Sequence, residues 1–368
     1  ASLSHGNQKN NYSGAQSDTL HGAMDLIWIP APDLNLFLKY RHQELETDNP
    51  DSVTLQGLTT TNIYPSVRDS VSSIKDSIAI SARYKPLRKV TLLSTYELIS
   101  LERKNIDDWQ VLPERTDINS IKLAADTRPF TNLKLKAAFN YLDYDDPALN
   151  TEPDSSNQIH LLATYTYAAW ITANLDYKLT RTERQQVRYL NNDPATIVDN
   201  ADRETRQDMI LGSLSFLLTP KTNLTASWVH LKNNLEQTLA YGKWNALGTG
   251  GDLPYLGAGD RYTDTANTYG LNLYFRVRKD ISTTFEISHT DSKGDFAPGA
   301  AMAQTPVSIA SFSPLKVSET LFSIESTKTF NNNWEIGIRL QTNNYNDRID
   351  DQQDGEFYSS MISFTKYY

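Results

Sequence analysis

Apolar and polar side chains alternate with a period of two along much of this chain. In the segment LNLFLKYR (34–41), Leu34, Leu36 and Leu38 share one face, and Lys39 and Arg41 lie on the other. A period of two is that of a β-strand, since an α-helix repeats every 3.6 residues. The same pattern occurs at 118–128, 133–141, 171–179, 269–277, 281–287 and 334–340, and we find no convincing helix. The sequence therefore predicts an all-β fold.

The connections between these runs are alternately short and long. The short ones lie at about 30–33, 85–89, 129–132, 168–170, 219–223, 277–280 and 329–333. The long ones lie at about 47–73, 103–117, 144–156, 185–204, 237–265, 292–315 and 347–356. A barrel that crosses the bacterial outer membrane has tight periplasmic turns at one rim and longer extracellular loops at the other. We therefore predict an antiparallel up-and-down transmembrane β-barrel of about 16 or more strands, counting a short strand near residues 1–5.

Strand length and aromatic placement both favour a membrane environment. Most predicted strands have about 11 to 13 residues, and a tilted strand needs roughly 9–11 to cross the hydrocarbon layer. Aromatic side chains form two girdles at the headgroup levels of such barrels. The candidates are Trp28, Tyr84, Tyr167, Trp170 and Trp334 beside the short turns, and Tyr40, Tyr96, Tyr141, Tyr177, Trp228 and Tyr345 toward the long connections. A soluble sandwich or propeller fits less well, because its strands are usually about five or six residues long.

Charged side chains lie opposite the apolar ones, and a charge on the lipid side costs about 2–4 kcal/mol near the bilayer midplane. We therefore expect residues 1–368 to form a single outer-membrane barrel domain with a charged lumen. In most barrels such charges only solvate a water-filled interior. The residues predicted to face the lumen are Lys39, Arg41, Arg83, Lys122, Asp126, Lys134, Lys136, Asp176, Lys178, Arg276, Glu286, Glu335 and Arg339.

The composition excludes several classes of function. The chain has no Cys, which excludes a disulfide-stapled fold, a thiolate metal site and covalent attachment of haem to this chain. Its 35 basic and 44 acidic side chains give a net charge of −9, which argues against a nucleic-acid partner. No run approaches 18 apolar residues, so we predict no membrane-spanning helix.

Signatures of catalysis are also missing. The six His residues are scattered, and neither a nucleophile elbow nor a P-loop occurs. We therefore expect no enzymatic activity, no bound metal and no cofactor on this chain. Acidic clusters at 143–146 and 347–354 could offer oxygen ligands to calcium, but they lack EF-hand spacing, and a solvated loop is the favoured interpretation.

Three segments of the chain share one hairpin format. The main one is ERTDINSIKLAADTRPFTNLKLKAAFNYLDYDD (114–146), in which an acidic segment precedes a strand, an Arg-Pro-aromatic turn and a second strand. SIAISARYKPLRKVTLLSTYELISLERKN (77–105) and HLLATYTYAAWITANLDYKLTRTER (160–184) repeat this hairpin format. The chain ends in FYSSMISFTKYY, which is similar to the aromatic C-terminal signal for barrel insertion. These segments resemble the MtrB/PioB family of decahaem-associated outer-membrane barrels.

The resemblance implies a non-catalytic sheath in the outer membrane that holds a periplasmic multihaem c-type cytochrome, with haem only on that partner. Electrons would then pass to an extracellular cytochrome or mineral. The residues alone leave two alternatives open: a general or substrate-selective diffusion porin, and the barrel portion of an outer-membrane transporter. Ala1 is not preceded by a charged or apolar leader, so we expect either a removed signal peptide or a longer N-terminal part.

Overall fold

The computed structural model describes most of the chain, and the described part consists of β-strands and their connections. The described residues are 1–10, 14–49, 53–56, 61–64, 70–107, 109, 112–148, 152–185, 188–190, 197–199, 202–244, 251–297, 314–330, 333–349 and 354–366. No helix in these ranges could cross a membrane.

Sixteen strands form one antiparallel sheet in which nearly every strand pairs with its neighbours in the chain. In sheet order they are β1 (Ser2–Lys9), β2 (Gln16–Ala31), β3 (Leu34–Asp48), β6 (Ser72–Leu87), β7 (Val90–Lys104), β8 (Arg115–Phe130), β9 (Leu133–Asp145), β10 (Ser155–Ala168), β11 (Ile171–Arg184), β14 (Arg203–Thr219), β15 (Thr222–Trp244), β16 (Gly251–Arg276), β17 (Ile281–Ala297), β18 (Leu315–Phe330), β19 (Trp334–Asp347) and β20 (Gly355–Lys366). The predicted all-β, up-and-down antiparallel architecture and the count of sixteen strands are confirmed.

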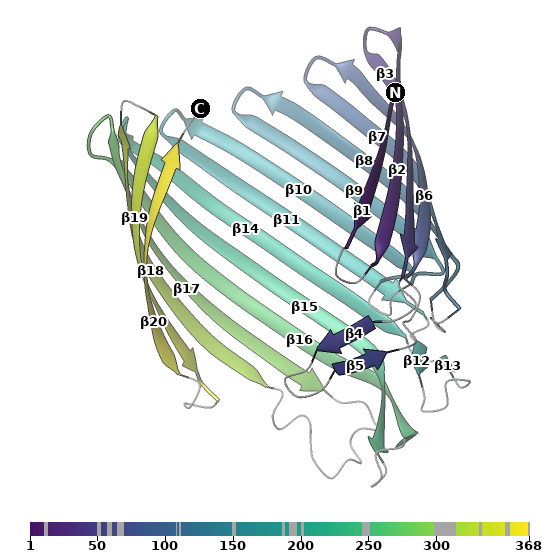
Figure 1. The fold of residues 1–368 in the computed structure, drawn as a ribbon. Helices are drawn as coiled ribbons and strands as arrows, with labels where there is room; N and C mark the ends of the chain where they lie inside the picture. The colour runs from purple at the N-terminus through teal and green to yellow at the C-terminus, as the bar shows by residue number, and fades with distance from the viewer. Residues whose placement is uncertain are drawn as a thin grey trace.

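The sheet is strongly curved, so that its first and last strands approach each other across an opening (Figure 1). Among the described residues, β1 pairs only with β2 and β20 only with β19. The strands are tilted, the short turns lie at one rim, and the long connections lie at the other (Figure 1). The curvature gives the sheet a concave inner face and a convex outer face.

The outer face carries a continuous apolar band. One row of cross-strand partners runs from Leu26 through Leu38, Ile80 and Tyr96 to Ile121. Leu26, Ile80 and Tyr96 expose 57%, 55% and 42% of their surface, whereas the only buried hydrophobic side chain in the described part of the chain is Val317. A soluble domain has the opposite distribution. Exposing these apolar side chains to water would cost free energy, and a surrounding hydrocarbon layer removes that cost.

Polar pairs end the apolar band on the side of the long connections. Asp76 accepts a hydrogen bond from the Tyr40 hydroxyl at 2.6 Å and lies 2.9 Å from Nδ1 of His42. Arg206 donates to Asp208 at 2.7 Å at the corresponding end of β14. Tyrosine rings followed by charged pairs are typical of the boundary between hydrocarbon and headgroups.

The connections follow the predicted alternation with one exception. Each predicted short connection is a turn between consecutive strands. The prediction of a long loop at 237–265 is wrong for most of that interval, because β15 continues to Trp244 and β16 begins at Gly251. Pairing of these two strands beyond the apolar band compensates for the weak alternation of this Gly-rich segment. Residues 245–250 lie outside the described ranges.

Two other details differ from the sequence-based expectation. Apart from β1, the sixteen strands span 12 to 26 residues rather than about 11 to 13, and the longest two, β15 and β16, project at the long-connection rim (Figure 1). Two long connections contain hairpins that were not predicted: β4 (Val53–Gln56) pairs with β5 (Thr61–Tyr64), and β12 (Arg188–Leu190) with β13 (Ile197–Asp199).

Candidate functional site

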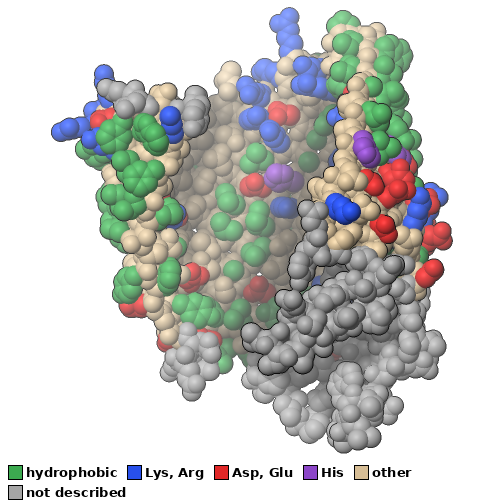
Figure 2. All heavy atoms as spheres, viewed as in Figure 1, with side chains coloured by type: hydrophobic (Ala, Val, Ile, Leu, Met, Phe, Trp, Pro, Cys, Tyr) green, Lys and Arg blue, Asp and Glu red, His purple; other side chains and the backbone are tan. Residues whose placement is uncertain are grey.

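The concave face of the sheet is the candidate functional surface, and strand register decides which side chains reach it. Lys39 lies across from Asp25, and Lys136 lies across from Asp126 and Leu162. Following the register from strand to strand places all thirteen residues predicted to face the lumen on this one face. They are Lys39, Arg41, Arg83, Lys122, Asp126, Lys134, Lys136, Asp176, Lys178, Arg276, Glu286, Glu335 and Arg339. Figure 2 shows this inner face through the opening, with acidic, basic and apolar side chains intermixed.

Several of these charges form ion pairs across neighbouring strands. Lys122 Nζ lies 3.6 Å from the Glu97 carboxylate. Asp126 lies 3.8 Å from Lys134 and 3.9 Å from Lys136, so one carboxylate neutralises part of the charge of two lysines. All of these side chains are at least one-quarter exposed, and such pairs contribute only about 0–1 kcal/mol each to stability. Their main effect is therefore on the electrostatic potential of the lumen.

Several polar members of the inner face were missing from the predicted set, among them Asp25 and His160. Asp25 lies 2.7 Å from Arg41, and His160 Nε2 lies 2.8 Å from Asp176. Asp25 precedes the run Leu26–Ile29, where both faces are apolar, so alternation gave no signal there. His160 and Leu162 lie two residues apart on β10 and therefore share a face. The period of two could have predicted that His160 faces the lumen.

One predicted girdle residue lies on the inner face. Tyr345 pairs with Glu319 across β18 and β19, and Glu319 has inward parity, so Tyr345 cannot belong to the outer girdle. The prediction for this residue was wrong because it overlooked parity: Tyr345 shares a face of β19 with Glu335 and Arg339, which were predicted to face the lumen. Trp28, Tyr84 and Tyr96 lie on the outer face, with 62%, 42% and 42% of their surface exposed.

Charge is unevenly distributed around the lumen. Strands β2–β11 carry seven of the predicted cations on the inner face, against four carboxylates. The cations are Lys39, Arg41, Arg83, Lys122, Lys134, Lys136 and Lys178, and the carboxylates are Asp25, Glu97, Asp126 and Asp176. We call this surface the basic sector.

The remaining strands differ from the basic sector. Between Met209 and Ser215 on β14, and between Thr225 and Leu231 on β15, the inward positions carry no charge. On β16–β19 the inward carboxylates outnumber the inward cations: besides inward aspartates there are four glutamates, Glu286, Glu319, Glu325 and Glu335, against two arginines, Arg276 and Arg339. We call this second surface the acidic sector. The lumen therefore has a basic side and an acidic side separated by hydroxyl and apolar groups.

A hollow of about 720 Å³ lies within the basic sector. Its apolar lining includes Phe37, Leu93 and Ala138, and its charged lining residues are Lys39, Arg83, Lys136 and Asp126. The hollow forms because alanines occupy the inward positions where β8 and β9 pair, which leaves space between longer side chains.

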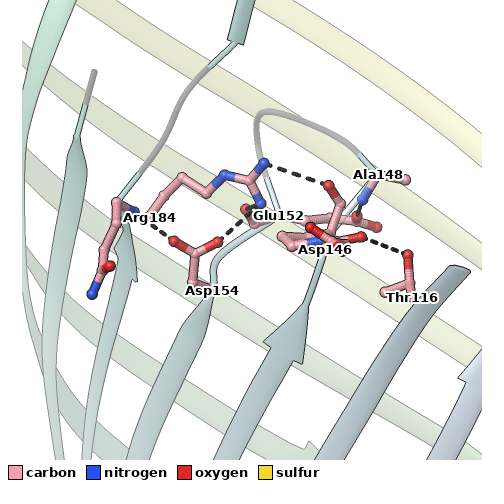
Figure 3. Close-up of polar contacts among 8 residues, drawn as sticks. Thr116, Asp146, Ala148, Glu152, Asp154 and Arg184 are labelled. Atoms are coloured by element: carbon pink, nitrogen blue, oxygen red, sulfur yellow. Dashed lines mark hydrogen bonds and ion pairs between the residues drawn. The ribbon is translucent and has the colours of Figure 1, made fainter. Parts of the chain in front are cut away.

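The long-connection rim next to the basic sector is held by two buried arginines. Arg184 lies 3.1 Å from the Asp154 carboxylate and donates to the backbone oxygens of Glu152 and Pro147 (Figure 3). Thr116 donates to the Asp146 oxygen at 2.7 Å and accepts from Arg103 at 2.9 Å. These contacts tie β7–β11 together where the loops begin, so the rim beside the basic sector has a defined shape.

The described part of the chain contains no cluster of side chains that could bind a metal ion. No group of three or more His, Asp or Glu side chains there has the arrangement of a metal site. Of the second acidic cluster, Asp350 and Asp351 lie outside the described residues, and Asp354 accepts a hydrogen bond from the Asp347 backbone N–H.

Comparisons with known proteins support the fold. No protein-family model and no curated protein sequence matches the chain. Among solved structures, the copper transporter OprC is similar with a TM-score of 0.57 and 10% identity, over 98% of this chain and 56% of OprC. The ferric-catecholate import receptor Fiu from E. coli K12 is similar with a TM-score of 0.59 and 11% identity, over 99% of this chain and 62% of Fiu.

The chain thus spans less than two thirds of the length of these two proteins. At such low identity the similarity concerns the fold. Together with the apolar outer band, it agrees with the predicted location in the bacterial outer membrane. The chain has the fold of an outer-membrane β-barrel protein whose polar, charged face lines the lumen.

Proposed function

We propose that this chain is the non-catalytic porin component of a porin–cytochrome complex. It encloses and positions a multihaem c-type cytochrome so that electrons cross the outer membrane. The observation that carries the proposal is the charged, hollowed concave face, which offers ionic and apolar contacts to a partner protein. The resemblance of residues 77–105, 114–146 and 160–184 to the MtrB/PioB family supports the same function.

The width of the lumen decides whether a folded partner fits inside it. Two transporters, OprC and Fiu, align with 98% and 99% of this chain at TM-scores of 0.57 and 0.59. Outer-membrane transporter barrels of 22 strands have a lumen that holds a folded plug, whereas 16–18-stranded porins leave an aqueous channel. Sixteen strands alone would enclose an aqueous channel, so a partner of domain size requires a wider barrel, and the sheet is open between β1 and β20 (Figure 1).

Electron transfer would depend on the partner. The chain has no Cys, so it cannot attach haem covalently, and every haem of the complex belongs to the cytochrome. The barrel contributes insulation from lipid through its outer band and alignment of the cytochrome through its inner face.

A transporter barrel is the second candidate, because the two similar solved structures are described as a copper transporter and a ferric-catecholate import receptor. In that function the lumen holds a plug and passes a solute instead of electrons. A diffusion porin, the third candidate, would leave the lumen open.

Proteoliposomes distinguish these functions. The barrel is reconstituted with and without a co-expressed periplasmic decahaem cytochrome, and a redox dye and a small radiolabelled sugar are trapped inside. We expect the complex to reduce the internal dye from an external donor while it retains the sugar. The barrel without cytochrome should not reduce the dye. Equal leakage of sugar in both preparations, with no electron transfer, would contradict the proposal and favour a porin.

A further inference from the structure

The basic sector contains cations that are not neutralised by the sheet itself. Lys39, Arg83 and Lys178 form no ion pair with any residue that the structure describes, although all three face the lumen. Lys39 and Arg83 line the hollow, and Lys178 lies across from His160, which also lines it. Uncompensated cations around an apolar floor form a surface that attracts an anionic partner.

The opposite side of the lumen has the opposite sign. The acidic sector has four glutamates against two arginines, and uncharged inward positions on β14 and β15 separate it from the basic sector. A partner with an acidic face is attracted to one side of the lumen and repelled from the other. Such an arrangement fixes rotation about the barrel axis, which a uniformly charged lumen could not do.

We propose that the basic sector is the seat for an acidic face of the enclosed cytochrome, and that the hollow bounded by Lys39 and Arg83 receives a projecting carboxylate-bearing group of that face. This inference rests on the proposed function, and it specifies which strands of the barrel contact the partner. The hollow suits a group that is both apolar and anionic, because Phe37, Leu93 and Ala138 line it together with Lys39 and Arg83, while its one carboxylate, Asp126, is paired with Lys136.

The ion pairs of the basic sector explain why Lys39, Arg83 and Lys178, rather than the other cations, are suited to bind a partner carboxylate. The lysines beside Asp126 are partly neutralised at 3.8 and 3.9 Å, and Arg41 is paired with Asp25 at 2.7 Å. An incoming carboxylate would compete with those existing partners. Lys39, Arg83 and Lys178 form no ion pair within 4.0 Å among the described residues, so a partner carboxylate would displace no existing partner.

The test uses the full chain co-expressed with a periplasmic decahaem cytochrome. The variant K39Q/R83Q/K178Q removes three positive charges from the basic sector, and glutamine retains a polar side chain of similar length. The matched control K232Q/K293Q/K316Q removes three positive charges from the opposite face of the sheet. Heat-dependent gel mobility checks that each barrel is folded, and haem absorbance per barrel after detergent purification measures retention across a series of NaCl concentrations.

We expect K39Q/R83Q/K178Q to retain at least tenfold less cytochrome than the unaltered barrel at about 0.15 M salt, where charges interact over roughly 8 Å. The control variant should retain as much as the unaltered barrel. Equal retention by both variants would overturn the basic sector as the seat while leaving the sheath function standing. Failure of the unaltered barrel to retain cytochrome at any salt concentration would overturn the proposed function itself.

A small-anion pathway is the competing occupant, and conductance distinguishes it. If the barrel without cytochrome conducts chloride in planar bilayers with a preference that K39Q/R83Q/K178Q abolishes, and cytochrome retention does not change, the basic sector serves ions. That result would overturn the proposal. No chloride preference, combined with charge-dependent retention, supports the cytochrome as occupant.

Discussion

At the scale of single residues, the face on which a side chain lies determines its role. Phe139 and Ala138 are neighbours in β9, yet Phe139 pairs with Leu123 and Ile159 on the outer face, whereas Ala138 pairs with Ala124 and His160 on the inner face. Because successive residues of a strand point to opposite faces, one position separates hydrocarbon from an aqueous lumen. Identical substitutions at the two positions should therefore have different effects.

We predict that Phe139→Arg destabilises the assembled barrel by about 2–4 kcal/mol, because the charge enters the lipid-facing band. Ala138→Arg places the same charge in the lumenal hollow, where water solvates it, and should change stability by less than about 1 kcal/mol. Urea unfolding in lipid vesicles, followed by the loss of heat-dependent gel mobility, measures both. Equal destabilisation by the two substitutions would contradict the assignment of faces.

At the scale of elements, the two rims differ in construction. Turns such as Thr131–Asn132 join adjacent strands directly, whereas the opposite rim has long connections and the buried Arg103 and Arg184 contacts. In outer-membrane barrels the short turns are periplasmic and the long loops extracellular. The same orientation for this chain is a prediction from the sequence, and the chain's lack of Cys makes it straightforward to test.

Cysteine labelling of intact cells tests this orientation. Asp107→Cys lies in the connection between β7 and β8 at the long-connection rim, and Asn132→Cys lies in the short turn between β8 and β9. We expect a membrane-impermeant maleimide to label Asp107→Cys in intact cells, and to label Asn132→Cys only after the outer membrane is permeabilised. Labelling of Asn132→Cys alone in intact cells would mean that the barrel has the reverse orientation.

At the scale of the whole molecule, the two edges of the sheet leave backbone hydrogen-bonding groups without partners in the described structure. β1 and β20 each pair on one side only in the described structure, and the opening between them is visible in Figure 1. In hydrocarbon an unpaired backbone N–H or C=O costs several kcal/mol. Edges of this kind are therefore not stable in a bilayer, and β1 and β20 should be hydrogen-bonded on their second side too, to each other or to further strands.

Hydrogen exchange in lipid nanodiscs measures this second pairing. We expect the amides of β20 between Tyr358 and Phe364 to exchange as slowly as those of β10, which has a strand on both sides. A soluble-like edge would instead exchange at every second residue within seconds. Rapid alternate exchange in β20 beside slow exchange in β10 would show that the edge stays unpaired in the membrane.

The fold class and the order of the strands follow from local pattern. Leu133–Tyr141 and Leu34–Tyr40 already show the period of two, and short turns alternate with long connections, so an up-and-down sheet is the simplest topology. The inward parity of Lys122, Lys134 and Lys136 follows from the same period. These features could be predicted because they depend on residues close together in the chain.

Tertiary structure decided what depends on pairing between strands. The extension of β15 and β16 through 237–265 needed cross-strand hydrogen bonds that periodicity does not report. The hollow is lined by Lys39 of β3, Arg83 of β6 and His160 of β10, and only the curved sheet places these three side chains around one space. The sequence by itself determined which side chains share a face, because alternation is local. The sheet's curvature and register alone determined which of those side chains face one another, because both are set by long-range pairing.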